Sequence, residues 1–177
     1  MVKTYYINLI IGFIFICLLG CSNSNSQTAD KYFEAGEYLK AVDEYTDVIA
    51  EDPNNFQAYL NGGKSYHELQ RYNLALVDYS VVIEMAPRNK EAYIFRGYIY
   101  ESQSNYYKAL TDYNIAISLD SKDPVTYIDR GDAYYALKEY IRALEDYARA
   151  LSISPDNEAA KAKIEYMSSE EFFNSRE

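Results

Sequence analysis

The stretch that decides the fold is residues 59–87, YLNGGKSYHELQRYNLALVDYSVVIEMAP. Its aromatic and small residues recur at intervals of three and four, which places them on one face of an α-helix. Residues 68–71 predict a tight reversal between two helices, and Pro87 ends the pair because proline cannot continue a helix. The two faces consist of Tyr59, Gly63 and Tyr66 in the first helix and of Tyr72, Ala75, Tyr79 and Ile83 in the second.

The same pattern recurs along the chain at intervals of 34 residues. A period of this length predicts stacked helical hairpins, each of which buries its apolar face against its neighbours. No sustained alternation typical of strands interrupts the pattern. The repeating columns are Ala41, Ala75, Ala109 and Ala143; Tyr38, Tyr72, Tyr106 and Tyr140; Tyr45, Tyr79, Tyr113 and Tyr147; Tyr32, Tyr66, Tyr100 and Tyr134; Gly63, Gly97 and Gly131, with Ala29 before them; and Pro53, Pro87 and Pro155, with Ser121 in the third unit.

This succession of aromatic, glycine, tyrosine, tyrosine, alanine, aromatic and proline resembles the tetratricopeptide repeat. The resemblance covers about residues 28–157 and implies an all-α fold, a right-handed α-solenoid of antiparallel helix hairpins. Residues 158–177 are expected to form a capping helix and a flexible tail, because a repeat array needs its last face covered. The expected units are residues 28–55, 56–89, 90–123 and 124–157.

Small residues in the repeat predict where the two helices of a hairpin come close. Glycine inside a helix costs up to about 1 kcal/mol relative to alanine, so its recurrence calls for a packing reason. We expect Gly63 and Ala75 to lie at the closest approach of their two helices, with tyrosines filling the space around that contact. Gly97 and Gly131, and the other alanines of the column, would play the same structural part.

The first 27 residues predict export and a lipid anchor. Residues 1–20 combine a positive start with a long uncharged run, which is typical of a signal peptide. The sequence Leu18-Leu19-Gly20-Cys21 resembles a bacterial lipobox, which implies cleavage before Cys21 and acylation of its thiol. Residues 21–27 would then be the lipidated cysteine and a polar tether. An uncleaved signal anchor and an ordinary secretory signal are the alternatives.

The charge of the chain narrows its partners and its location. A formal net charge of −10 argues against nucleic acid and against electrostatic attachment to anionic lipids. We therefore expect other proteins, as peptide or helix segments, to be the partners, with the membrane reached through the lipid at Cys21. The expected location is the bacterial cell envelope. Ser22 after the cysteine favours the outer membrane where a cell has two.

Motifs that would carry chemistry are weak. Gly63-Lys64-Ser65 lacks the preceding glycine of a phosphate-binding loop, because Ala58 stands there, and it lies within a predicted helix. His67 is the only histidine, and both cysteines lie in the first 21 residues, so neither a metal site nor a catalytic triad is indicated. We expect no enzyme activity, no metal, no cofactor and no small-molecule substrate.

One acidic column and one basic column follow the repeat. Asp78, Asp112 and Asp146 recur at the 34-residue step, after Glu44. Arg96 and Arg130 recur as well, whereas Gly62 takes the arginine position in the second unit. A single acid in each repeat predicts a structural ion pair or a surface charge rather than acid–base catalysis.

The resemblance also implies a binding surface. In the family, first helices line a concave groove, and the matching positions vary between units, as a recognition surface requires. Positions exposed to solvent without a function would vary as well. The basic residues and asparagines of the family's carboxylate clamp are missing. The groove candidates are Leu60, Lys64 and His67, then Ile94, Tyr98 and Glu101, then Ile128, Asp132 and Tyr135; the recognition strip would be Leu60, Tyr98, Ile128 and Tyr135, all outside the packing columns.

Together these patterns favour a membrane-anchored scaffold for protein–protein interaction, which binds a peptide or a partner helix in its groove. The alternative is a structural subunit of an envelope assembly machine, of the pilus or outer-membrane biogenesis type. An enzyme ranks last, because no nucleophile, metal set or phosphate loop survives inspection.

Overall fold

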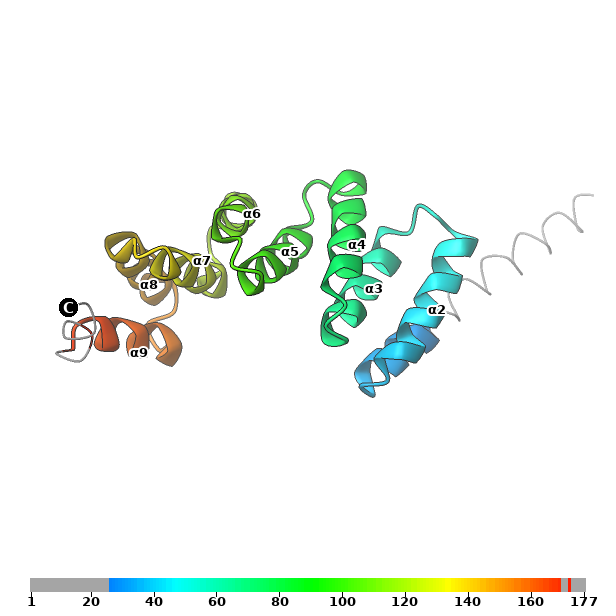
Figure 1. Ribbon diagram of the computed structural model, residues 1–177, viewed down its shortest axis with the longest axis horizontal. Coiled ribbons are helices and arrows are strands. Elements are labelled where there is room, and N and C mark those ends of the chain that lie inside the picture. The colour runs from blue at the N-terminus through cyan, green and yellow to red at the C-terminus, as the bar shows by residue number, and fades with distance from the viewer. Residues whose placement is uncertain (1–25, 170–171, 173–177) are drawn as a thin grey trace, which may run out of the picture. The chain divides into compact units, whose positions relative to one another are not determined.

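A computed structural model describes residues 26–169 and residue 172, and Figure 1 shows its helices. In these residues the chain is all-α, without strands, which confirms the predicted fold class. Cys21 and the predicted export signal lie outside the described residues. The helices, after a helical segment at 26–34, are α2 Tyr38–Glu51, α3 Phe56–Glu68, α4 Tyr72–Met85, α5 Lys90–Ser102, α6 Tyr106–Leu119, α7 Pro124–Ala136, α8 Tyr140–Ile153 and α9 Glu158–Met167.

A column of polar side chains starts the first helix of each hairpin. The side chain of Asn55 accepts a hydrogen bond from the backbone N–H of Ala58, which satisfies a donor that the helix leaves unpaired. Asn89, Asp123 and Asn157 cap α5, α7 and α9 in the same way. Because Asn157 follows the 34-residue step, α9 occupies the position of a first helix in the repeat.

The turn inside each hairpin uses a residue in the left-handed backbone region. Gly36, Gln70, Ser104 and Lys138 have φ values of 73°, 57°, 59° and 61°. At Gln70 the turn is closed by backbone hydrogen bonds from Gln70 N–H to the carbonyl of His67 and from the next N–H to the carbonyl of residue 66. This closure is a Schellman motif, which ends the first helix and reverses the chain.

The recurring glycines lie against tyrosine rings of the paired helix, which agrees with the expectation that tyrosines surround the close contact of the two helices. A Cβ atom added at Gly63 would lie 2.8 Å from a ring carbon of Tyr79. At Gly97 the distance to Tyr113 would be 2.6 Å, and Gly131 has the same relation to Tyr147. Glycine is needed because a flat ring, larger than a methyl group, fills the contact. The alanine column, Ala41, Ala75, Ala109 and Ala143, is fully buried.

The chain divides into two units, residues 1–86 and 87–177. In the first unit α2 packs on α3 and α3 on α4; in the second, each helix from α5 to α9 packs on its neighbours (Figure 1). Among the described residues, no helix is long and apolar enough to cross a membrane.

The end of the second unit has a core that the sequence did not predict. Phe172 is 3 % exposed and packs with Met167 and with the rings of Tyr135, Tyr140 and Tyr166. Phe172 thus packs on the end of the array, and the rest of the predicted tail after Ser169 lies outside the described residues. The ring of Phe172 covers apolar surface at the end of the repeat array, and the burial of this surface stabilises the contact.

Candidate functional site

Two of the predicted groove residues belong to the core, which corrects their assignment to a recognition strip. Leu60 is 2 % exposed and Ile128 is 9 % exposed. Leu60 lies one helical turn before Gly63, and Ile128 one turn before Gly131, so each shares the face that contacts the paired helix. Substituting either residue would damage the fold before it revealed any partner.

The other predicted groove residues keep part of their surface open to solvent, and they lie on α3, α5 and α7. His67 packs edge-on against the ring of Tyr72, with ring centres 5.8 Å apart. Tyr98 packs in the same manner on Phe95 and Tyr113. The half-buried candidates are Lys64 and His67 on α3, Ile94, Tyr98 and Glu101 on α5, and Asp132 and Tyr135 on α7.

A polar contact joins the first helices of neighbouring hairpins. In the second unit the Tyr98 hydroxyl donates to Asp129 at 2.7 Å, and Lys163 on α9 lies 2.5 Å from Asp132. In the first unit the side-chain amide of Asn61 donates to Asp30 at 3.2 Å. In each pair the two residues are 31 positions apart, and the earlier residue of each pair occupies the same position in the repeat, so one position makes the contact with the next hairpin.

Tyrosines of the second helices donate hydrogen bonds to carboxylates of the first helices. Tyr113 donates to Glu101 at 2.8 Å, and Tyr147 donates to Asp132 at 2.6 Å. Their rings are buried, and burial raises the pKa of each phenol, so the hydroxyl stays a neutral donor. We refer to Tyr98, Glu101, Asp129, Asp132 and Lys163 as the polar ladder of the second unit.

The polar ladder is acidic, and burial raises the pKa of two of its carboxyl groups, those of Asp129 and Glu101. Burial raises the pKa of Asp129 to about 7, and the nearby charges of Glu101 and Asp132 act in the same direction, against the hydrogen bond from Tyr98. Burial also raises the pKa of Glu101. Such carboxylates gain from a cation or from hydrogen-bond donors that a ligand provides. No set of three metal-ligating side chains occurs among the described residues.

A small pocket opens at the end of the polar ladder, between α7, α8 and α9. Its volume is about 190 Å³, which is below that of sites for drug-sized ligands and suits a single side chain. Two predicted groove residues contribute to it. The lining consists of Asp132, Tyr135, Tyr147, Lys163, Tyr166 and Met167.

For the acidic column the sequence left open a structural ion pair or a surface charge, and the structure shows ion pairs for Asp112 and Asp146. Arg96 donates to both carboxylate oxygens of Asp112, at 2.8 and 2.7 Å. Arg130 makes the same two-pronged contact with Asp146, at 2.8 and 2.6 Å. Both carboxylates are buried in the hairpin core. They are structural, because the arginine occupies both oxygens and leaves no proton acceptor facing solvent.

Comparisons with known proteins agree with this architecture. Models of the tetratricopeptide repeat match residues 29–70, 63–124 and 124–157. No curated protein sequence matches the chain.

Solved structures give the same result. A crystal structure of MamA is 26 % identical over 75 % of this chain and 77 % of its own, with a TM-score of 0.71. MamA from Desulfovibrio magneticus RS-1 is 21 % identical over 77 % of each chain, with a TM-score of 0.72. The first tetratricopeptide domain of Spaghetti (RPAP3), bound to the HSP90 peptide SRMEEVD, is 26 % identical over 66 % of this chain and 93 % of its own, with a TM-score of 0.62. The chain belongs to the tetratricopeptide repeat family.

Proposed function

We propose that this protein is a membrane-anchored scaffold that binds a segment of another protein along the first helices of its hairpins. The observation that carries the proposal is the polar ladder. Its carboxylates are half-buried and rich in acceptors, and two of them have a raised pKa. A partner segment that supplies hydrogen-bond donors or positive charge would relieve this cost of burial.

The likeness to the RPAP3 domain supports peptide binding. The chemistry of the polar ladder indicates that the peptide bound here differs from the HSP90 peptide. The peptide in that structure ends in two glutamates, a valine and an aspartate. Here the Tyr98 hydroxyl donates to the carboxylate of Asp129, and the carboxylate of Asp132 accepts from the Tyr147 hydroxyl. An acidic ligand would meet like charge there, so we infer a basic or neutral partner segment.

A double variant tests the ladder while it preserves the fold. Glu101→Gln with Asp129→Asn removes two charges but keeps oxygen acceptors for the hydroxyls of Tyr98 and Tyr113. We expect partner capture by the full-length, membrane-extracted protein to weaken about tenfold, a loss of about 1.4 kcal/mol, with unchanged helical circular dichroism.

The matched control changes two exposed acids of the same unit, Glu145→Gln with Asp156→Asn. It removes the same charge outside the ladder and should leave capture unchanged. Equal capture by both double variants would show that binding uses another surface.

The anchor is tested separately at Cys21. Cys21→Ser should abolish labelling by fatty acid and prevent signal removal. A variant that remains in membranes after high-salt washing, with Met1 at its N-terminus, would establish the signal-anchor alternative. The alternative of a subunit in an envelope assembly predicts a stable large complex after mild solubilisation.

A further inference from the structure

The ion pairs of the second unit have a second component, which is a pair of tyrosine rings around each guanidinium. The central carbon of the Arg130 guanidinium lies 5.5 Å from the ring centre of Tyr127 and 5.9 Å from that of Tyr134. The corresponding carbon of Arg96 lies 5.9 Å from both Tyr93 and Tyr100. Each site therefore combines a two-pronged carboxylate with two aromatic faces, an arrangement that suits the planar guanidinium better than an ammonium.

The first unit keeps this site without its arginine. Asp78, Tyr59 and Tyr66 occupy the places of the carboxylate and the two tyrosines, since each lies 34 residues before its counterpart around Arg96. Gly62 stands where the arginine would be. A Cβ atom added there would have only the Oδ2 of Asp78, at 3.2 Å, and the Cβ of Tyr45, at 3.8 Å, within 4 Å.

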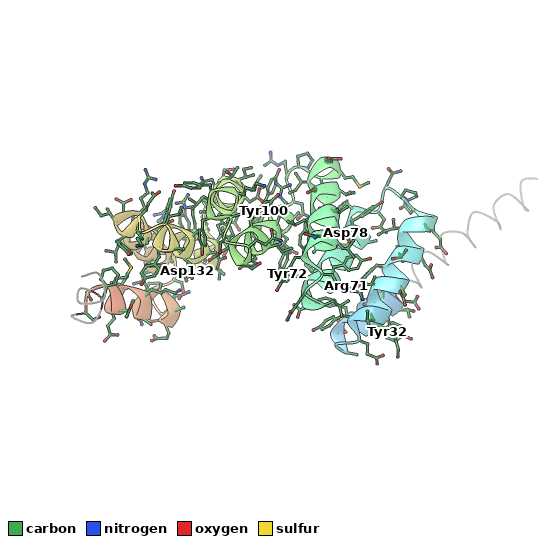
Figure 2. The ribbon with its side chains drawn as sticks, in the orientation of Figure 1. Tyr32, Arg71, Tyr72, Asp78, Tyr100 and Asp132 are labelled. Carbon is green, nitrogen blue, oxygen red and sulfur yellow. The ribbon has the colours of Figure 1, made fainter. Side chains whose placement is uncertain are left out.

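Asp78 has no counter-ion among the described residues. Burial raises its pKa to about 7, and no hydrogen bond or positive charge opposes that effect. Figure 2 labels Asp78 on α4, the helix that packs on α3. Its charge also helps burial to raise the pKa of the Tyr66 phenol, so the carboxylate and this ring are neighbours.

The charged groups around this site leave it negative. Asp43 on α2 also raises the pKa of Tyr66, and Arg71 in the turn lowers it. Glu68 at the end of α3 acts with Asp78 on the pKa of Tyr79. Arg71 is exposed and makes no ion pair with Asp78. A cation from outside the chain thus meets a half-buried carboxylate in acidic surroundings.

We propose that Asp78, Tyr59 and Tyr66 form a guanidinium socket that receives an arginine side chain of a partner protein. The socket goes beyond the proposed groove, because it uses none of the polar ladder. A protein-borne arginine is the occupant because both sister sites hold an arginine side chain, and a net charge of −10 attracts basic protein surfaces. The partner would restore the ion pair that Gly62 removes.

The first experiment fills the socket from within. In the full-length protein, Gly62→Arg should bring a guanidinium to Asp78, and Gly62→Ala is the matched control with the same Cβ atom. The pKa of Asp78, measured by NMR of its carboxyl carbon, should fall below 4 in the arginine variant and stay near 7 in the alanine variant. An Asp78 pKa that is equal in both variants would overturn the proposal.

The second experiment offers the guanidinium from outside. The peptide acetyl-Ala-Arg-Ala-amide, added to the full-length protein at pH 8, should give saturable shifts at Asp78 and Tyr66. We expect binding to weaken at least tenfold in Asp78→Asn and in Gly62→Arg. It should be unchanged in Glu101→Gln with Asp129→Asn, so failure of the socket and failure of the groove are distinguishable.

Two further probes define the ligand. Acetyl-Ala-Lys-Ala-amide should bind at least fivefold more weakly, because lysine lacks the planar fork, and equal binding would overturn a guanidinium socket. Methylguanidinium should also bind more weakly than the arginine peptide. Equal or tighter binding of methylguanidinium would assign the socket to a free small molecule and overturn the partner arginine.

Discussion

The hairpins α3–α4 and α7–α8 share the same repeat architecture and differ at the position of the buried arginine, which is Gly62 in the first and Arg130 in the second. Both have a capped first helix, a glycine against a tyrosine ring and a left-handed turn residue. In α7–α8, Arg130 holds Asp146; in α3–α4, Gly62 leaves Asp78 unpaired, with its pKa raised to about 7. The hairpin therefore forms with or without the ion pair. The arginine supplies the counter-ion of the carboxylate that Asp78 lacks.

The largest expected effect comes from removing the arginine of α7–α8, so that this hairpin lacks the ion pair as α3–α4 does. Arg130→Ala leaves the buried Asp146 without its partner and should lower the free energy of unfolding by about 3 kcal/mol. Adding Asp146→Asn should recover more than half of this loss. Urea unfolding measures both.

The matched control is Arg142→Ala, which removes an exposed ion pair with Glu139 and should cost under about 0.5 kcal/mol. Equal losses from Arg130→Ala and Arg142→Ala would contradict a special role for burial.

The next effect tests the contact between a glycine and a tyrosine ring, which both hairpins share. Gly131→Leu forces a side chain into the ring of Tyr147 and should cost about 2 kcal/mol, as should Gly97→Leu against Tyr113. Gly62→Ala, the neighbour that faces a carboxylate oxygen rather than a ring, should change stability little. Thermal unfolding that ranks Gly62→Ala with the leucine variants would show that the glycine–tyrosine contact is not the tight one.

A pH dependence separates Asp78 from its paired counterparts. Its folded pKa of about 7 exceeds the unfolded value of about 3.9, so the folded protein binds more protons between these values. Asp78 therefore lowers stability as pH rises from about 4 to about 7.

Asp78→Asn should accordingly stabilise the protein at pH 8 by about 1 kcal/mol, after allowance for partial exposure, and by less at pH 5. Asp129 titrates in the same range, so the difference between wild type and variant is the quantity to measure. Parallel stability curves from pH 4 to pH 8 would refute the unpaired state of Asp78.

The smallest effect concerns the turns, which all hairpins share. Gln70 and Lys138 adopt φ values of 57° and 61°, where glycine carries no steric penalty. Replacing either with glycine should stabilise by about 0.5 kcal/mol, because the greater freedom of unfolded glycine offsets part of the relief. Gly36→Ala should destabilise by a similar or larger amount. If denaturant titrations show that glycine at these turns lowers the free energy of unfolding, the left-handed turn residues are not under backbone strain.

Much of the fold could be predicted because repetition is visible without a structure. The 34-residue columns predicted helical hairpins. The acidic column predicted a structural ion pair or a surface charge, and the structure shows the ion pairs with Arg96 and Arg130. Asn55, Asn89, Asp123 and Asn157 form a further column at the 34-residue step, and such residues before a helix are strong start signals.

The partners of each residue could not be predicted, because a period says which positions are equivalent and not what they touch. Leu60 and Ile128 vary between units as surface residues do, yet both are buried, since apolar residues of different shape can fill the same core position. The tight contact of Gly63 with a ring rather than with Ala75 depends on how the helices cross.

The sequence by itself determined the repeat and its helices, because local spacing and helix-breaking residues specify them, and it showed that Gly62 stands where the later units have arginine. Only the tertiary structure decided that this absence matters. Packing of α3 against α4 buries Asp78, and burial raises its pKa. The hydroxyls of Tyr113 and Tyr147 meet Glu101 and Asp132 for the same reason. Helix packing joins residues distant in the chain, and the environment so created sets their charge.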